Sequence, residues 1–428
     1  MRIITFLILV FISSLGVVQA QNTTSPYSIY GIGVIENNAY NRTAGMGSTG
    51  IAYRSENNII NNNPAAYTAL IPQMFHIEAG GSGDFSSYTN ANFSNATTGY
   101  TNQLSNDFTV THISFATKVT KFWGAAVGLQ PYSRMNYDYN GLQPLGPQGE
   151  EATVTYQGTG GVHKAYFGNG FSIGKHFSVG ATASFMFGAL NQSENLIAPT
   201  ANANVTTTRN LYMRNVLFDF GAQYYTHFGK EKKWGLTLGA TYTPQQPLYA
   251  EDSVVTISGN TILPNGNVLL DRNVFQLPSG YGGGFQLSKE SVMKRVSFLA
   301  DYSRQMWSPL NYQGTGYSLE NADRYSAGFE VSKKANIFNT PVEHVYYQLG
   351  GYYQRSYINV QGYPLQEWGA TMGIGINPLR YPQWGYHIAL EYGQTSNYEI
   401  GSIKEDFVRL TVTIHYWDRW FTRGRRVL

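Results

Sequence analysis

The sequence contains no cysteine among its 428 residues. This absence excludes disulfide bonds, thiolate metal sites and a cysteine nucleophile. It also excludes a lipoprotein anchor, which needs a cysteine to carry the lipid. The folded chain must therefore be held together by packing and hydrogen bonds alone.

Charged residues and long apolar runs are also scarce. Charged side chains make up 13% of the chain, well below the roughly 25% of an average soluble domain. The formal net charge of +3 lacks the strong basic excess of a nucleic-acid-binding protein, so we expect no such partner. Beyond residue 20 no apolar run is long enough for a membrane-spanning helix.

The first twenty residues have a different character. Arg2 precedes an apolar run over residues 3–12, and Val18-Gln19-Ala20 supplies small residues at a cleavage position. This pattern predicts a secretory signal peptide over residues 1–20, removed in the mature protein. The mature chain is therefore expected outside the cytoplasm.

Aromatic residues and glycine are abundant. Tyr, Phe and Trp together reach 15%, and the chain has 46 glycines. In the segment 408–416 (VRLTVTIHY) every even-numbered residue is apolar or aromatic and every odd-numbered one is polar. Period-two alternation in an aromatic-rich, exported chain is typical of a strand in a transmembrane β-barrel, with one face on lipid and one on the lumen.

Counting all such runs predicts fourteen antiparallel strands, an even number as bacterial barrels require. Long and short connections alternate between them, as expected for one rim of loops and one rim of tight periplasmic turns. The predicted fold class is all-β, a 14-stranded antiparallel transmembrane β-barrel with a plug in its lumen. The runs are 74–81, 107–119, 122–132, 164–174, 176–190, 210–229, 233–245, 280–289, 295–305, 323–333, 344–356, 367–378, 384–394 and 405–417.

Gly45, Gly47 and Gly50 have the spacing of a dinucleotide-binding turn. That motif needs a preceding strand, a following helix and an acidic residue about twenty positions on, and here position 70 is leucine. A fourteen-stranded barrel is too wide for its own side chains to fill. We therefore expect residues 21–73 to form a plug whose glycines allow close approach to the wall.

The turn Asn63-Pro64-Ala65, the fourteen strands and the closing segment 401–423 resemble the bacterial outer-membrane transporters of long-chain fatty acids and aromatic hydrocarbons. The resemblance implies that the N-terminal segment forms a hatch to which Asn63, Pro64 and Ala65 belong. It also implies uptake of apolar molecules from outside. Other barrels that resemble this family are instead fixed subunits of secretion or assembly machines.

If the strand parity holds, several charged side chains point into the lumen. We expect the acids among them to pair with Arg42 and Arg54 of the plug, and we consider ligand contact the alternative. No serine, histidine or acid stands in a catalytic motif, so we expect neither an enzyme nor a cofactor or metal. The predicted lumen residues are Asp219, Asp301, Glu330, Glu391 and Arg409.

The sequence thus predicts four parts: a signal peptide (1–20), a plug (21–73), a barrel (74–417) and a basic periplasmic tail (418–428). We expect the protein in the outer membrane of a Gram-negative bacterium, with both termini on the periplasmic side. The predicted function is passive uptake of small hydrophobic molecules, and the alternative is a non-transporting subunit of a multiprotein complex. The expected partners are outer-membrane lipids, with small apolar ligands and other outer-membrane or periplasmic proteins as further candidates.

Overall fold

The computed structural model describes most of the chain. None of the helices in this part is long and apolar enough to cross a membrane. The predicted signal peptide and residues 420–428 of the predicted tail lie outside the described residues. The described ranges are 25–36, 40–89, 102–144, 151–197, 204–259, 261–270, 274–310, 313–314, 317–337, 340–360, 362–397 and 403–419.

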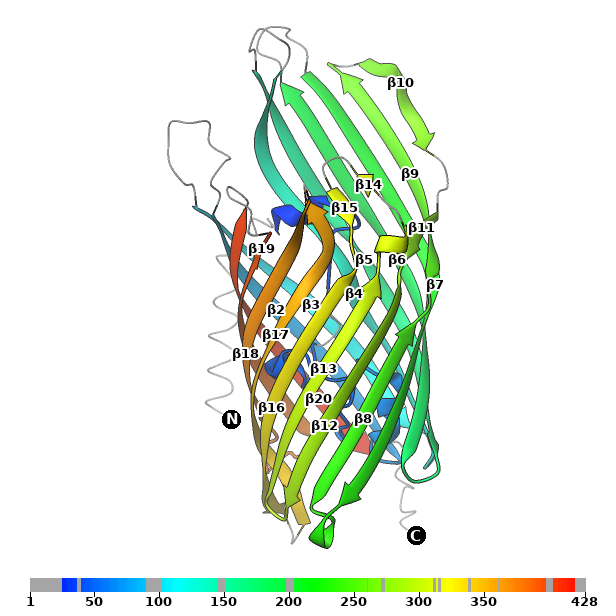
Figure 1. The fold of residues 1–428 in the computed structure, drawn as a ribbon, viewed down its shortest axis with the longest axis vertical. Helices are drawn as coiled ribbons and strands as arrows, with labels where there is room; N and C mark the ends of the chain where they lie inside the picture. Colours follow the sequence, from blue (N-terminus) through cyan, green and yellow to red (C-terminus); the bar gives the residue numbers. More distant parts are fainter. Residues whose placement is uncertain are drawn as a thin grey trace, which may run out of the picture.

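The wall is a closed antiparallel β-barrel of 14 strands (Figure 1), so the predicted fold class is confirmed. Each strand pairs with its neighbours along the chain, and the last strand pairs with the first. The strands are β2 (Met74–Thr89), β3 (Asn102–Lys118), β4 (Trp123–Pro144), β5 (Glu151–Ile173), β6 (Phe177–Ile197), β7 (Asn204–Phe228), β8 (Trp234–Thr243), β12 (Ser279–Ser291), β13 (Lys294–Met306), β16 (Ala322–Ile337), β17 (Thr340–Val360), β18 (Tyr363–Ile376), β19 (Trp384–Ser396) and β20 (Lys404–Arg419).

Several strands run well beyond their predicted ends. The polar stretches 82–106, 133–163 and 191–209, expected as loops, are strand at the residues that the structure describes. Short strands also extend the wall outside the predicted runs: β9 (Gln246–Ser258), β10 (Thr261–Leu270), β11 (Val274–Leu277), β14 (Gln313–Gly314) and β15 (Tyr317–Leu319). Above the lipid a strand needs no apolar face, because neighbouring strands still satisfy its backbone groups.

The outward face of β5 marks where the membrane ends. Phe167 and Phe171 are exposed in its lower half, whereas Gln157 and Thr159 are exposed in its upper half. The strand has 23 residues, or about 75 Å at 3.3 Å per residue, against an apolar band of about 25 Å. The strands β5, β6, β7 and β9 therefore rise as a sheet beyond the rest of the barrel (Figure 1).

The wall has a seam between β3 and β4. Their ladder covers only Ile113–Lys118 against Gly124–Leu129. Above it, the short strand β1 (Val34–Ile35) pairs with β4 at Ser133 and Arg134. A segment from the N-terminal part of the chain therefore takes the position beside β4 that β3 leaves.

The N-terminal segment, residues 25–36 and 40–73, lies inside the barrel (Figure 1). Its short 3₁₀ helices are η2 (Pro26–Ile29), η3 (Ala44–Met46) and η4 (Pro64–Ala69). The η3 helix contacts β16–β19, whereas η4 contacts β3–β7. Two small apolar clusters, one around Met46 and Tyr53 and one around Ile59 and Tyr67, fix it to the lower wall.

The outer half of the lumen is filled by a larger apolar core. Ile32 and Trp307 are almost fully buried there, with Met135, Leu248 and Ile358 around them. Burial of apolar surface on this scale stabilises the outer half by the hydrophobic effect. The lumen is therefore blocked at two levels, by the N-terminal segment below and by this core above.

The first described residue lies in the outer half of the barrel. The Ser25 hydroxyl donates a 2.7 Å hydrogen bond to the carboxylate of Glu405, at the outer start of β20. The predicted N-terminus, expected on the periplasmic side, lies outside the described residues, whereas Ser25 lies at the outer end of the wall. Polar groups at this end bond to the wall, which holds the segment there.

Candidate functional site

The most buried charge in the lumen is Arg42 of the N-terminal segment. Its guanidinium contacts Glu330 of β16 at 2.9 Å and Glu343 of β17 at 2.6 Å. The side chains of Arg42 and Glu330 are 2% and 1% exposed. The ring of Tyr346 lies 3.7 Å from the guanidinium carbon, and Arg295 forms a second ion pair with Glu330. This cluster, here the Arg42 clamp, ties the segment to two adjacent strands.

Electrostatics favour the charged form of the Arg42 clamp. Burial alone would lower the pKa of Arg42, but the charges of Glu330 and Glu343 outweigh it and hold that pKa well above its ordinary value. Glu330 also accepts hydrogen bonds from the Tyr53 hydroxyl and the Gln348 amide. A buried pair whose remaining lone pairs are satisfied in this way is costly to break.

Arg54 was expected to pair with an acid, and this expectation is wrong. Among the described residues it forms no ion pair, and it donates to Ser178, Gln223 and Thr68 instead. Its guanidinium also lies over the ring of Tyr225 at 4.0 Å. Burial without a carboxylate lowers the pKa of Arg54 to about 10. The side chain still contacts the wall, through neutral groups.

Asp301 holds the backbone of the glycine stretch. One carboxylate oxygen accepts the N–H of Gly50 at 2.7 Å and of Ile51 at 2.8 Å. Gly47 has φ +62°, and a Cβ there would lie 2.6 Å from the carbonyl oxygen of Gly351. A Cβ on Gly45 would likewise meet the backbone of the wall. These glycines permit close backbone approach to the barrel wall.

Asn63 joins the N-terminal segment to β7 and β8. Its side-chain oxygen accepts the N–H of Ala65, which caps η4, where Pro64 occupies the first position. Its amide nitrogen donates to the carbonyls of Ala222 at 3.1 Å and Ala240 at 3.2 Å. One side chain therefore ends a turn and fixes it against two strands of the wall.

A second network of charges crosses the seam. Arg134 of β4 contacts Asp107 of β3 at 2.9 Å, Asp84 of β2 at 3.3 Å, and Glu36 of the N-terminal segment. Arg409 contacts Asp84 from the other side. Ion pairs therefore join β4 to β3 where their backbone ladder is missing.

Glu391 lies at the end of this network. It is 3.7 Å from Arg409 and accepts a hydrogen bond from the Tyr352 hydroxyl. The same hydroxyl contacts Glu367 at 2.6 Å. Asp219, on the other wall, accepts from the Thr243 hydroxyl at 2.6 Å.

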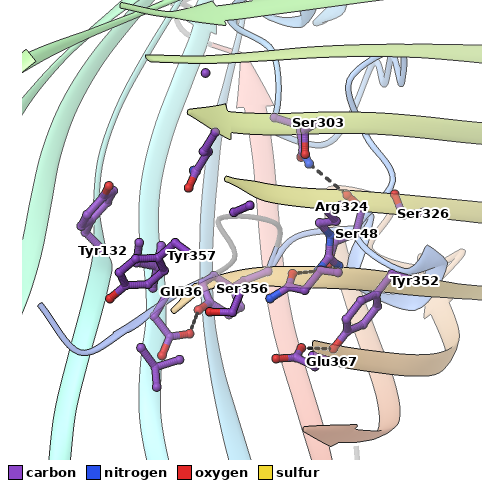
Figure 2. A pocket seen from close by; sticks show the side chains of 18 of the residues that line it. Glu36, Ser48, Tyr132, Ser303, Arg324, Ser326, Tyr352, Ser356, Tyr357 and Glu367 are labelled. Atoms are coloured by element: carbon purple, nitrogen blue, oxygen red, sulfur yellow. Dashed lines mark hydrogen bonds between the residues drawn. The ribbon is translucent and has the colours of Figure 1, made fainter. Parts of the chain in front are cut away.

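These groups surround a cavity of about 480 Å³ between the N-terminal segment and the outer apolar core. Tyr132 and Tyr357 lie toward one side of it, and Arg324, Tyr352 and Glu367 toward the other (Figure 2). Its charged lining includes Asp219, Asp301, Glu391, Arg409 and Lys164. The lining therefore combines charged groups with apolar and aromatic side chains such as Leu217 and Tyr357.

The sequence did not predict that some charged side chains face the lumen. Glu343 lies between two predicted strands, so the alternation of inward and outward residues gave no direction for its side chain. Arg134 follows an irregularity of β4 at Pro131, where the inward and outward positions no longer alternate evenly. Asp84 lies in a stretch assigned as a loop. Continued alternation in the polar stretches was the available signal.

Comparison with known proteins gives one family. The family model described as BamG matches residues 1–426. No curated protein of described function matches the sequence.

The solved structures give the fold. A FadL homologue of Pseudomonas aeruginosa is 11% identical with a TM-score of 0.56, covering 91% of this chain and 99% of its own. The Pseudomonas putida toluene transporter TodX is 14% identical with a TM-score of 0.55, covering 89% and 98%. The Ralstonia pickettii toluene transporter TbuX is 14% identical with a TM-score of 0.51, covering 87% and 97%. The resemblance drawn from the sequence is confirmed for the fold, which is that of these transporter barrels.

Proposed function

The chain belongs to the BamG family, and on that premise we propose that it is a closed barrel acting as a fixed subunit of a multiprotein outer-membrane complex. The observation that carries the proposal is the blocked lumen. The Arg42 clamp and η4 hold the N-terminal segment, which serves as a plug, against the lower wall. The apolar core around Trp307 fills the outer half. A barrel closed twice is suited to a structural role.

The cavity lining supports the same proposal. An apolar molecule in the lumen would lie against Glu391, Arg409 and their partners, whose desolvation is costly. The sheet formed by the outer halves of β5, β6 and β7 offers a surface beyond the membrane. Exposed Gln157 and Thr159 on β5 give it the polar character of a protein contact outside lipid.

The native size tests this proposal. We expect the protein, extracted in mild detergent through a terminal tag, to run on a native gel above the mass of one barrel. Other outer-membrane proteins should co-purify in fixed stoichiometry. An unrelated tagged barrel, extracted in the same way, is the control for lipid and detergent. A lone barrel in every mild detergent would contradict the proposal.

Uptake of small hydrophobic molecules is the second candidate, favoured by the seam between β3 and β4. There the wall lacks a backbone ladder above Ile113, and only β1 covers β4. Transport by this route would require β1 to leave β4 so that an apolar molecule could pass between lumen and membrane.

A disulfide lock decides between the two, because the chain has no cysteine of its own. Ile35→Cys with Ser133→Cys joins directly opposed residues of β1 and β4, whose separation suits a disulfide. If the barrel transports, oxidation should abolish uptake of labelled toluene or fatty acid, and reduction should restore it. Ser288→Cys with Ser297→Cys, between the permanent neighbours β12 and β13, is the matched control. Our proposal expects no uptake above that of cells without the protein, locked or not.

A further inference from the structure

One buried cation in the lumen has no partner. Lys164 of β5 is 9% exposed and lines the cavity. Among the described residues it forms no hydrogen bond or ion pair. The ring of Tyr132 lies 6.0 Å from its ammonium group, and the charge of Asp219 acts on it through space. An ammonium group removed from bulk water without a partner is costly. Its persistence here indicates a group that binds it from the cavity.

An unpaired carboxylate faces the same space from β7. Within the described part of the chain, the Thr243 hydroxyl is the one group that donates to Asp219, which also lines the cavity. Lys164 lies opposite Met186 of β6, and Asp219 opposite Thr182, four residues away along that strand. At about 3.3 Å per residue their backbone positions are offset by about 13 Å along that strand. The charge of Asp219 acts on Lys164 through space, but no ion pair joins the two side chains in the described part of the chain. Two opposite charges therefore face one cavity without contacting each other.

Two neutral groups that line the same cavity also lack partners among the described residues. The hydroxyl of Ser184 and the side-chain oxygen of Asn62 are buried without a hydrogen-bond partner among the described residues. Both residues line the cavity. Buried polar groups normally have hydrogen-bond partners. Lys164, Asp219, Ser184 and Asn62 can therefore each form a further hydrogen bond or ion pair with a ligand in the cavity.

We propose that Lys164, Asp219, Ser184 and Asn62 bind a small zwitterion such as a free α-amino acid. Its carboxylate contacts Lys164, and its ammonium group contacts Asp219. A simple anion bound to Lys164 would be repelled by Asp219, and a simple cation bound to Asp219 would be repelled by Lys164. A neutral polyol would leave both charges without a counter-charge. The cavity, about 480 Å³, is far larger than the roughly 30 Å³ share of one water molecule. The site does not depend on whether the barrel transports.

To test this proposal, the protein is folded in the presence of a labelled ligand, so that the ligand is enclosed in the lumen. The full mature chain is refolded from urea into detergent with radiolabelled L-alanine, and free label is removed by gel filtration. We expect one alanine retained per folded chain, and little retention of labelled acetate or methylamine. Lys164→Met and Asp219→Asn should each lower retention by about tenfold or more. Lys118→Met is the matched control, because that ammonium group is already bonded to the carbonyl of Thr68.

The outcomes separate the possibilities without relying on any one variant. Folding is followed by the shift in gel mobility between heated and unheated samples. If folded wild-type protein retains no alanine, the cavity holds only water and the proposal is overturned. If acetate is retained as well as alanine, and Asp219→Asn changes neither, the site is an anion site and the proposal fails. The comparison of the three probes on wild-type protein stands even if a variant does not fold.

Discussion

Arg42→Met is expected to lower the free energy of unfolding by about 3–5 kcal/mol, the usual cost of leaving a buried charge without its partner. Glu330 and Glu343 would remain buried against Arg295 alone. The N-terminal segment would lose its attachment to β16 and β17. Because Ile32 of the same segment belongs to the outer apolar core, that core should loosen too, and we expect single-channel conductance in planar bilayers. Urea unfolding followed by tryptophan fluorescence measures the first effect.

Two control variants make this result specific. Arg42→Met combined with Glu343→Gln removes one charge of each sign and leaves Glu330 paired with Arg295, so it should recover most of the stability. Arg214→Met removes an arginine whose side chain is 62% exposed and 3.6 Å from Glu251. Exposed pairs contribute about 0–1 kcal/mol, so Arg214→Met should change little. An equal effect of Arg42→Met and Arg214→Met would show that the clamp does not hold the segment.

The strands were predictable because lipid and lumen impose opposite demands on alternate residues. The run 408–416 and its counterparts carry that pattern in full, and all fourteen predicted runs are strands. The outer halves of β4–β7 were not predicted, because polar residues there face water on the outside and only partly apolar groups within. Gln157 and Thr159 therefore resemble loop residues in a sequence, although their backbone is fully paired.

The lumen contacts were predictable only where a strand was regular. Parity placed Glu330 and Asp301 toward the lumen, and the structure places them against Arg42 and the backbone of Gly50. Parity could not identify their partners, because pairing depends on how an irregular segment is threaded through the barrel. Arg42 pairs with acids and Arg54 does not, because the path of the segment through the barrel places only Arg42 beside carboxylates.

Comparing alanine substitutions at Gly47 and Gly174 distinguishes the cost of backbone strain from the cost of a steric clash. Both glycines have left-handed φ values, +62° and +66°. A Cβ on Gly174 meets nothing within 4 Å, whereas one on Gly47 lies 2.6 Å from the carbonyl oxygen of Gly351. Gly174→Ala should therefore cost only the left-handed strain, about 1–2 kcal/mol. Gly47→Ala should cost the same strain and a further 1–3 kcal/mol or so for overpacking.

Gly47→Ala and Gly174→Ala should differ more in whether the lumen opens than in their loss of stability. At Gly47 the wall opposes the new methyl group with backbone, which no side-chain movement can relieve, so the segment must move away from β17. We expect Gly47→Ala to produce conductance in planar bilayers and Gly174→Ala to produce none. Equal stability losses with no conductance in either would mean that the glycine stretch is only a turn. The lumen would then be closed by the apolar core around Trp307 alone.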